Sequence, residues 1–203
     1  MTTLKICGIT RREQAEIIAD LGVDYLGFVV VPHTPRYVPP EALPALTTNL
    51  PQVQKIGVFR QFDPATIYDI ARKANLDGIQ LHGQESLEFC RKIKELLPDR
   101  LLIKAVAIKQ PDDLLLANSY SQIVDIILLD VPKEGTEKTI DWQMLRHFRP
   151  RGKWWLAGGL NADNVKVAID IAQPDGIDLA SGVEDSPGIK NIAKIKTLLS
   201  ALR

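Results

Sequence analysis

Short apolar runs bounded by turn-forming residues recur along the whole chain, and segments with apolar residues at helical spacing lie between them. Eight of the runs have the length and nearly continuous apolarity of strands in a parallel sheet. They cover residues 4–7, 25–31, 55–59, 78–81, 101–108, 126–129, 153–157 and 177–180. Helical spacing is found in residues 12–21, 64–74, 86–97, 111–119, 162–171 and 189–202. The pattern therefore predicts strands and helices that alternate along the chain.

The spacing of these units indicates the fold. The predicted strand centres recur about every 25 residues, the length of one strand, one helix and two short loops. Such units use all 203 residues and leave no linker, so we expect one domain over residues 1–203. A compact (β/α)8 barrel of the α/β class (a TIM barrel) fits best, with a doubly wound open sheet as the alternative. The first turn reads Cys7-Gly8-Ile9-Thr10, not Gly-x-Gly-x-x-Gly, which disfavours the open dinucleotide-binding sheet.

The balance of charges limits the class of partner. Lys and Arg number 25, as do Asp and Glu, so the formal net charge is zero and offers no attraction for nucleic acid or an anionic membrane. No apolar run approaches the roughly 20 residues that span a bilayer, and the N-terminal residues carry no secretory apolar stretch. We therefore expect a soluble, cytoplasmic protein whose partner is a small molecule.

The cysteines do not form a recognisable disulfide or metal pattern. There are two, Cys7 and Cys90, which are too few for a disulfide framework and lie in no Cys-x-x-Cys or His/Cys cluster. We expect two thiols, with Cys90 packed in a helix, and no metal site.

Residues at the carboxyl ends of the predicted strands carry the candidate chemistry, because barrel enzymes place their active sites there. The turns Gly158-Gly159 and Ser181-Gly182 follow the seventh and eighth strands, where barrels commonly bind phosphate through backbone N–H groups. Each turn alone is equally consistent with an ordinary loop. Two such turns at the two expected positions favour a phosphate site.

Cys7 and Asp130 end the first and sixth strands. Cys7 is either a small buried apolar residue or, as a thiolate, a general base. Asp130 follows an apolar run, so it is either a loop cap or a carboxyl that is kept protonated and acts as a general acid. Together they suggest proton transfer on a bound sugar phosphate.

Two further polar residues lie at the same predicted end of the sheet. Arg36 follows Pro35, and its planar guanidinium suits a substrate carboxylate, although a surface arginine is the alternative. His82 either donates a hydrogen bond to the ligand or fills a position at the barrel mouth. His33 and His147 are expected in solvent.

The period of two along a strand gives a prediction about the barrel interior. If Cys7 faces inward, Lys5 does so as well, one layer deeper, and a buried ammonium needs a partner. The eighth strand lies beside the first in a closed barrel and carries Asp178 in an apolar run. We predict a Lys5–Asp178 ion pair; the alternative is that Asp178 bonds to backbone and Lys5 extends to the rim.

Seven short segments, in order along nearly the whole chain, resemble one family. They are residues 5–10 (KICGIT), 34–38 (TPRYV), 55–59 (KIGVF), 79–83 (IQLHG), 141–142 (DW), 156–160 (LAGGL) and 181–184 (SGVE), the last followed by Pro187-Gly188. Each segment is weak evidence alone, but the ordered set is specific. The chain resembles the phosphoribosylanthranilate isomerases of tryptophan biosynthesis.

The resemblance implies a (β/α)8 enzyme without metal or organic cofactor. It would convert N-(5-phosphoribosyl)anthranilate to 1-(2-carboxyphenylamino)-1-deoxyribulose 5-phosphate by an Amadori rearrangement. Cys7 would be the general base and Asp130 the general acid, on opposite sides of the sugar. Arg36 would bind the anthranilate carboxylate, and the turns at Gly158-Gly159 and Ser181-Gly182 would hold the phosphate. The family resemblance leaves open a monomer or a homodimer.

One segment departs from the family pattern. The family usually carries a Gly-Gly-Ser/Thr-Gly turn after the acid, whereas this chain has Glu134-Gly135-Thr136-Glu137. Two glutamates reduce backbone freedom and add negative charge near an anionic substrate. Two alternatives therefore stay open: a related phosphosugar isomerase or epimerase, and a binder of phosphorylated ligands that has lost the chemistry.

Overall fold

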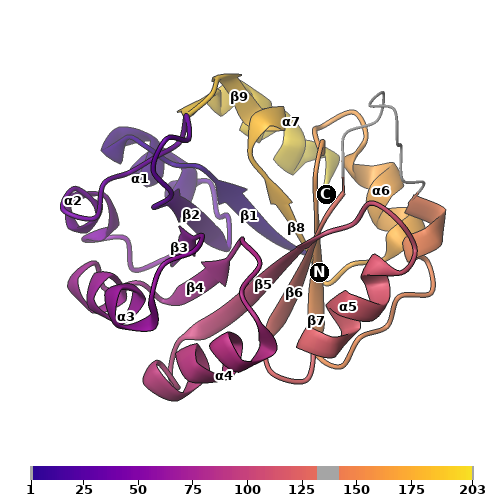
Figure 1. Cartoon of the computed structure of the whole chain (residues 1–203). Coiled ribbons are helices and arrows are strands. Elements are labelled where there is room, and N and C mark those ends of the chain that lie inside the picture. Colours follow the sequence, from indigo (N-terminus) through magenta and orange to yellow (C-terminus); the bar gives the residue numbers. More distant parts are fainter. Residues whose placement is uncertain (1, 132–141, 203) are drawn as a thin grey trace.

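Eight parallel strands form a closed barrel in the computed structural model, which describes residues 2–131 and 142–202 (Figure 1). The strands are β1 (Thr3–Cys7), β2 (Tyr25–Val29), β3 (Gln54–Phe59), β4 (Gly78–Leu81), β5 (Leu101–Ala107), β6 (Ile126–Asp130), β7 (Lys153–Ala157) and β8 (Gly176–Leu179). Each strand pairs with the next, and β8 pairs with β1 to close the barrel. The (β/α)8 prediction is confirmed, and the open-sheet alternative is wrong because an open sheet would leave β1 and β8 unpaired at its edges.

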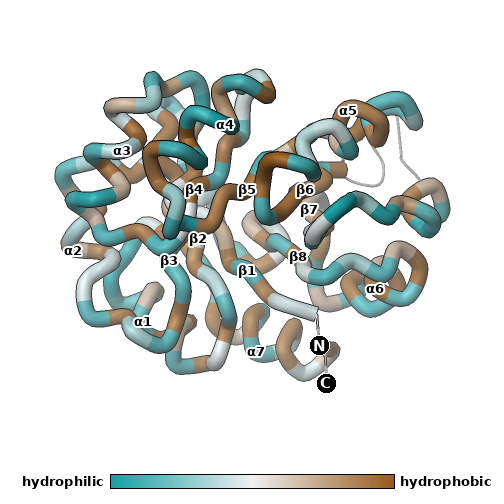
Figure 2. Tube along the Cα trace, turned by 90° about the horizontal axis from the view of Figure 1, so that it is seen from below, coloured by the Kyte–Doolittle hydropathy of each residue, from teal (hydrophilic) through white to brown (hydrophobic). Residues whose placement is uncertain are grey.

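Helices surround the barrel and separate it from solvent. They are α1 (Arg12–Asp20), α2 (Leu43–Thr47), α3 (Pro64–Lys73), α4 (Leu87–Leu96), α5 (Asp113–Tyr120), α6 (Val165–Ala172) and α7 (Ile192–Ala201), with 3₁₀ turns η1 (Trp142–Leu145) and η2 (Ser181–Val183). Figure 2 shows apolar strands inside and helices that mix polar and apolar turns outside. Three helices begin at side-chain caps, namely α3 at Asp63, α4 at Ser86 and α7 at Asn191. The Asp63 carboxylate, for example, accepts a bond from the Thr66 N–H, 2.9 Å away, with Pro64 in the first turn.

Two predicted helices begin later than expected, and one short helix was not predicted. The segment 189–202 begins as strand β10 (Ile189–Lys190), which pairs with β9 (Glu184–Ser186), and becomes helical only at Ile192. Helix α6 begins at Val165, not at 162, because the Asn161 side chain accepts bonds from the N–H groups of residues 163 and 164 and forms a turn there. Helix α2 was not predicted, because it is only five residues long. Glu134 and Glu137 lie outside the described residues.

The interior of the barrel and the layer between barrel and helices are two separate apolar clusters. The interior cluster consists of inward-facing strand residues, namely Ile56, Ile103, Ala105, Ile126, Leu128, Trp155 and Ala157. The larger cluster packs the outward-facing strand residues against the helices. This separation follows from the period of two along each strand, and it places alternate residues at the carboxyl ends of the strands over the barrel axis.

A repeated aspartate joins neighbouring strands at the amino-terminal end of the barrel. One aspartate precedes each even-numbered strand and accepts a hydrogen bond of 2.8–2.9 Å from a backbone N–H of the odd-numbered strand before it. The pairs are Asp24 with Leu4, Asp77 with Lys55, Asp125 with Leu102, and Asp175 with Trp154. The repeating structural unit at this end is therefore a pair of strands.

Asp77→Ala is expected to lower the free energy of unfolding by about 1–3 kcal/mol, because it leaves the Lys55 N–H without its acceptor. The Lys55 ammonium, 3.0 Å from the same carboxylate, also loses its partner. Urea unfolding followed by tryptophan fluorescence measures the change. Asp99→Ala, an exposed aspartate at the same end of the barrel, is the control. Equal stability of the two variants would contradict a structural role for the aspartate.

Candidate active site

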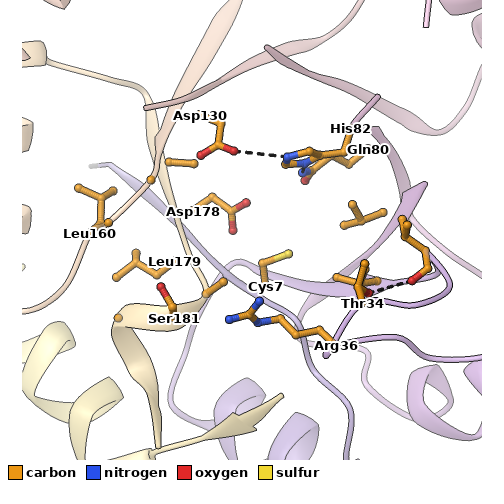
Figure 3. Close-up of a pocket in the computed structure, with 18 of the residues that line it drawn as sticks. Cys7, Thr34, Arg36, Gln80, His82, Asp130, Leu160, Asp178, Leu179 and Ser181 are labelled. Atoms are coloured by element: carbon orange, nitrogen blue, oxygen red, sulfur yellow. Dashed lines mark hydrogen bonds and ion pairs between the residues drawn. The ribbon is translucent and has the colours of Figure 1, made fainter. Parts of the chain in front are cut away.

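A cavity of about 460 Å³ opens at the carboxyl ends of the strands. All eight residues predicted as catalytic or substrate-binding line it, namely Cys7, Arg36, His82, Asp130, Gly158, Gly159, Ser181 and Gly182. They come from β1, from loops after β2, β4, β7 and β8, and from the end of β6, and Figure 3 shows how the labelled ones surround the cavity. The size suits a small organic ligand.

The walls of the cavity differ in chemistry. Val29, Val31 and Val58 form an apolar wall on the side of β2 and β3. The glycine turns after β7 and β8 form the opposite wall. The cavity therefore provides an apolar surface for a ring at one end and backbone groups for an anion at the other.

Cys7 lies over the barrel axis because Gly27 on the neighbouring strand has no side chain. A Cβ at Gly27 would lie 2.7 Å from the Cys7 Sγ and 3.1 Å from the Lys5 Cε. Burial raises the pKa of the Cys7 thiol, and the positive charges of Lys5 and Lys190 offset only part of that effect. The Lys190 ammonium also donates to the Cys7 carbonyl and so fixes the end of β1.

Lys5 and Asp178 form the ion pair that was predicted from the sequence. The Lys5 Nζ lies 2.8 Å from the Asp178 Oδ2, and the two residues are register partners across the β1–β8 seam. Lys5 is fully buried and the Asp178 side chain is 7% exposed. Burial would lower the pKa of Lys5, but the negative charges of Asp178 and of a Cys7 thiolate outweigh it and raise that pKa. Lys5 therefore places a positive charge below Cys7.

Asp130 ends β6 and points into the cavity, where its side chain is 41% exposed. Because β6 ends at this residue, the carboxylate reaches the open cavity and does not carry the desolvation cost of a buried carboxylate. Its Oδ2 lies 3.5 Å from the Nε2 of His82. A dashed line marks this contact in Figure 3. The amide nitrogen of Gln80, a buried inward-facing residue, lies 2.9 Å from the His82 Nδ1. Because an amide N–H donates, Gln80 leaves the proton of a neutral His82 on Nε2, facing Asp130.

Arg36 is held by Glu184, a residue that the sequence analysis quoted in a motif but gave no role. The Arg36 Nε and Nη2 donate to the two carboxylate oxygens of Glu184 at 2.8 and 2.6 Å. Lys190 and the Gly188 N–H also bond to Glu184. Burial alone would raise the pKa of Glu184, but the bonds from Arg36 and Lys190 hold it below its ordinary value. This side-on pairing leaves the Nη1 group of Arg36 available for a ligand carboxylate.

The glycines of the two turns are required by close backbone packing. Gly158 has a φ of 98°, and a Cβ there would lie 1.6 Å from the carbonyl oxygen of Val131. A Cβ at Gly182 would lie 1.9 Å from the carbonyl oxygen of Leu160. Gly159 has a φ of 63°. The two turns thus interlock through backbone, and no residue with a side chain fits at Gly158 or Gly182.

Gln80, Glu184 and Lys190 support the site residues and were not identified as such from the sequence. Gln80 could have been identified from the sequence, because the period of two places it on the inward face of its strand, two residues before His82. Glu184 and Lys190 could not have been identified in this way, because they meet only when β9 and β10 pair. Across the residues that the structure describes, no group of His, Cys, Asp and Glu could hold a metal ion. No described helix is long and apolar enough to cross a membrane.

Comparisons with known proteins give a consistent result. The model of the N-(5'-phosphoribosyl)anthranilate (PRA) isomerase family matches residues 4–201. An N-(5'-phosphoribosyl)anthranilate isomerase of a Synechococcus strain is 47% identical, over 98% of this chain and 89% of that protein.

Two solved structures are also similar over almost their whole length. Monomers generated from a dimeric phosphoribosylanthranilate isomerase of Thermotoga maritima are 40% identical, with a TM-score of 0.89 over 99% of this chain and 98% of that chain. A phosphoribosylanthranilate isomerase in complex with a reduced 1-(o-carboxyphenylamino)-1-deoxyribulose 5-phosphate is 39% identical, with the same TM-score and coverage.

Proposed function

Because this chain belongs to the N-(5'-phosphoribosyl)anthranilate isomerase family, we propose that Cys7 is the general base and Asp130 the general acid of its reaction. The chain is an aldose–ketose isomerase of tryptophan biosynthesis that acts on N-(5'-phosphoribosyl)anthranilate. The observation that carries the assignment is that both residues end strands over one cavity, which also holds Arg36 and the two glycine turns.

The substrate is oriented by its two anionic ends. The phosphate binds the turns at Gly158-Gly159 and Ser181-Gly182, through backbone N–H groups and the Ser181 hydroxyl. The anthranilate ring lies on the apolar wall of Val29, Val31 and Val58, and its carboxylate accepts a bond from Arg36. The sugar then spans the centre of the cavity, between Cys7 and Asp130.

The reaction proceeds by two proton transfers. Asp130 donates a proton to the ribose ring oxygen as the bond from that oxygen to C1 breaks, and the nitrogen lone pair forms a protonated Schiff base. The Cys7 thiolate then removes the proton from C2, the electron pair forms a C1–C2 double bond, and the nitrogen regains its lone pair. The product of these steps is an enolamine, the enol form of the ketose.

Arg36→Met is expected to weaken binding of the reduced product analogue by about 2–4 kcal/mol, because a charge-assisted contact to its carboxylate is lost. Glu184 keeps Lys190 as its partner in the variant, so the fold is retained. Titration calorimetry with the analogue and with a des-carboxy analogue measures the effect. A loss of affinity that is equal for the two ligands would show that Arg36 does not recognise the carboxylate.

The raised pKa of the Cys7 thiol predicts how kcat/KM depends on pH. Because burial holds the pKa of Cys7 above its ordinary value, the free enzyme contains little thiolate at neutral pH. The active form carries a thiolate at Cys7 and a proton on Asp130, so it holds as many protons as the form with a neutral thiol and an ionised Asp130, and the ratio of the two forms does not depend on pH. The value of kcat/KM should therefore be level around neutral pH and fall only above the raised thiol pKa. Steady-state assays across pH, on the fluorescence of the substrate, test this. A fall that already begins at neutral pH would exclude a thiol with a raised pKa as the base.

Two further properties rest on the family and on composition. The Thermotoga maritima relative is described as dimeric, and we expect this chain to be a monomer or a homodimer. The neutral net charge and the absence of a membrane-spanning helix among the described residues support a cytoplasmic location.

A further inference from the structure

The carboxylate of Asp178 has one oxygen that is bound and one that is free. Oδ2 accepts the bond from Lys5 at 2.8 Å. Oδ1 is buried and has no hydrogen-bond partner among the described residues, and the side chain lines the cavity. A buried carboxylate oxygen without a donor costs free energy, so its position in a ligand cavity points to a donor on the ligand.

The strand register places this oxygen between the two proposed proton-transfer residues. Asp130 pairs with Ala157, Ala157 pairs with Asp178, and Asp178 pairs with Lys5, across four neighbouring strands. All four positions face the barrel interior, as does Cys7, two residues after Lys5. Because Ala157 is small, the space between the carboxylates of Asp130 and Asp178 is not filled by a side chain from β7. Figure 3 shows Asp178 between Asp130 and Cys7.

The proposed function leaves two protons without an assigned route. When the enolamine forms, Asp130 has lost one proton and Cys7 has gained one. To become the ketose, the enolamine must lose the proton of its C2 hydroxyl and gain a proton at C1. Cys7 holds a proton next to these carbons, but no group is yet assigned to the hydroxyl.

We propose that Asp178 is a catalytic base that removes the C2 hydroxyl proton and completes formation of the ketose on the enzyme. The proton passes to Oδ1, the O–H electron pair forms the C2 carbonyl, and the C1–C2 double bond takes a proton at C1 from the Cys7 thiol. Cys7 is again a thiolate, Asp178 is protonated and Asp130 is ionised. The cycle closes when the proton of Asp178 passes to Asp130 across Ala157, directly or through a water molecule. This inference rests on the proposed function of Cys7 and Asp130.

Lys5 is the positioning residue for this base. Its ammonium fixes the Asp178 carboxylate through Oδ2, so that Oδ1 is directed into the cavity. Its charge favours an ionised Asp178 at the start of each cycle. Because Lys5 is fully buried beneath the cavity, it can act on the substrate only through the residues above it.

The test uses the stereochemistry of the product formed in D₂O. In the parent enzyme, the Cys7 thiol gives C1 either the proton that it took from C2 or a deuteron exchanged from solvent, so deuterium enters at no more than one of the two C1 positions, which NMR reads after immediate borohydride trapping. Asp178→Asn keeps a hydrogen-bonding group beside the hydroxyl but removes the base, so kcat should fall by about 10²-fold or more. Its residual product should carry deuterium equally at both C1 positions, because the released enolamine becomes a ketone in solution. Binding of the reduced product analogue should change less than about threefold, since the amide oxygen can face Lys5 while the amide N–H donates to the hydroxyl oxygen of the ligand.

Matched variants separate the possible outcomes. Asp175→Asn, at the opposite end of β8, should keep the turnover and the labelling pattern of the parent enzyme. If Asp178→Asn fails to bind the analogue, Lys5→Met/Asp178→Asn removes both buried charges and is expected to give the same labelling at both positions. Stereospecific labelling by either variant, or labelling at both positions by the parent enzyme, would overturn the role of Asp178. Full turnover by Cys7→Ser would refute the proposed function and with it the role of Asp178, whereas stereospecific labelling by Asp178→Asn together with loss of turnover in Cys7→Ser would refute the role of Asp178 alone.

Discussion

Cys7→Ser and Asp130→Asn each lower kcat by about 10²–10⁴-fold, because each removes one proton-transfer group and leaves the binding contacts in place. A serine hydroxyl is far less acidic than a thiol and is not a base at neutral pH. An asparagine amide keeps the size of Asp130 but cannot donate a carboxyl proton to the ring oxygen. Loss of substrate fluorescence, with the substrate generated in situ, measures the rate.

Two controls identify the cause of the loss. Affinity for the reduced product analogue should change little in either variant, because Arg36 and the glycine turns are unaltered. The free energy of unfolding should also change little, since Asp130 is half-exposed and serine is close to cysteine in size. A variant with nearly normal kcat would show that its residue has another role.

Asp178→Ala lowers the free energy of unfolding by about 3–5 kcal/mol, because it leaves the ammonium of Lys5 buried without a partner. Lys5 is fully buried and its partner oxygen is 2.8 Å away, so its ammonium keeps a desolvation cost that the carboxylate offsets in the parent protein. Lys5→Met leaves the Asp178 carboxylate equally unpaired. Replacing both residues removes both charges, and it should therefore cost much less than the sum of the single changes.

A double-mutant cycle with Lys5→Met, Asp178→Ala and the double variant measures the coupling by urea unfolding. The exposed pair Lys92 and Glu95, 3.6 Å apart, is the matched control, for which little coupling is expected. Additive losses at Lys5 and Asp178 would mean that the buried pair has no net coupling. That result would leave the assignment of Cys7 and Asp130 unaffected.

The sequence determined the architecture because the barrel is built from local patterns. Strand and helix periodicity repeat at nearly constant intervals, and the turn residues mark most boundaries to within a few positions. The period of two was also sufficient to place Lys5 below Cys7, and closure of the barrel then required Asp178 as its neighbour. The candidate site residues could be read from the strand ends for the same reason, since all eight parallel strands end at one face.

Only the tertiary structure decided how these residues are supported. The Glu184 carboxylate binds Arg36 and Lys190 because β9 and β10 pair, and this pairing overrides the helical spacing that the sequence shows from residue 189. The free oxygen of Asp178 and the position of Gln80 behind His82 likewise depend on atoms from different strands. Local propensity fixes the period and direction of an element, but hydrogen-bond partners are set by distances between elements, which no single segment encodes.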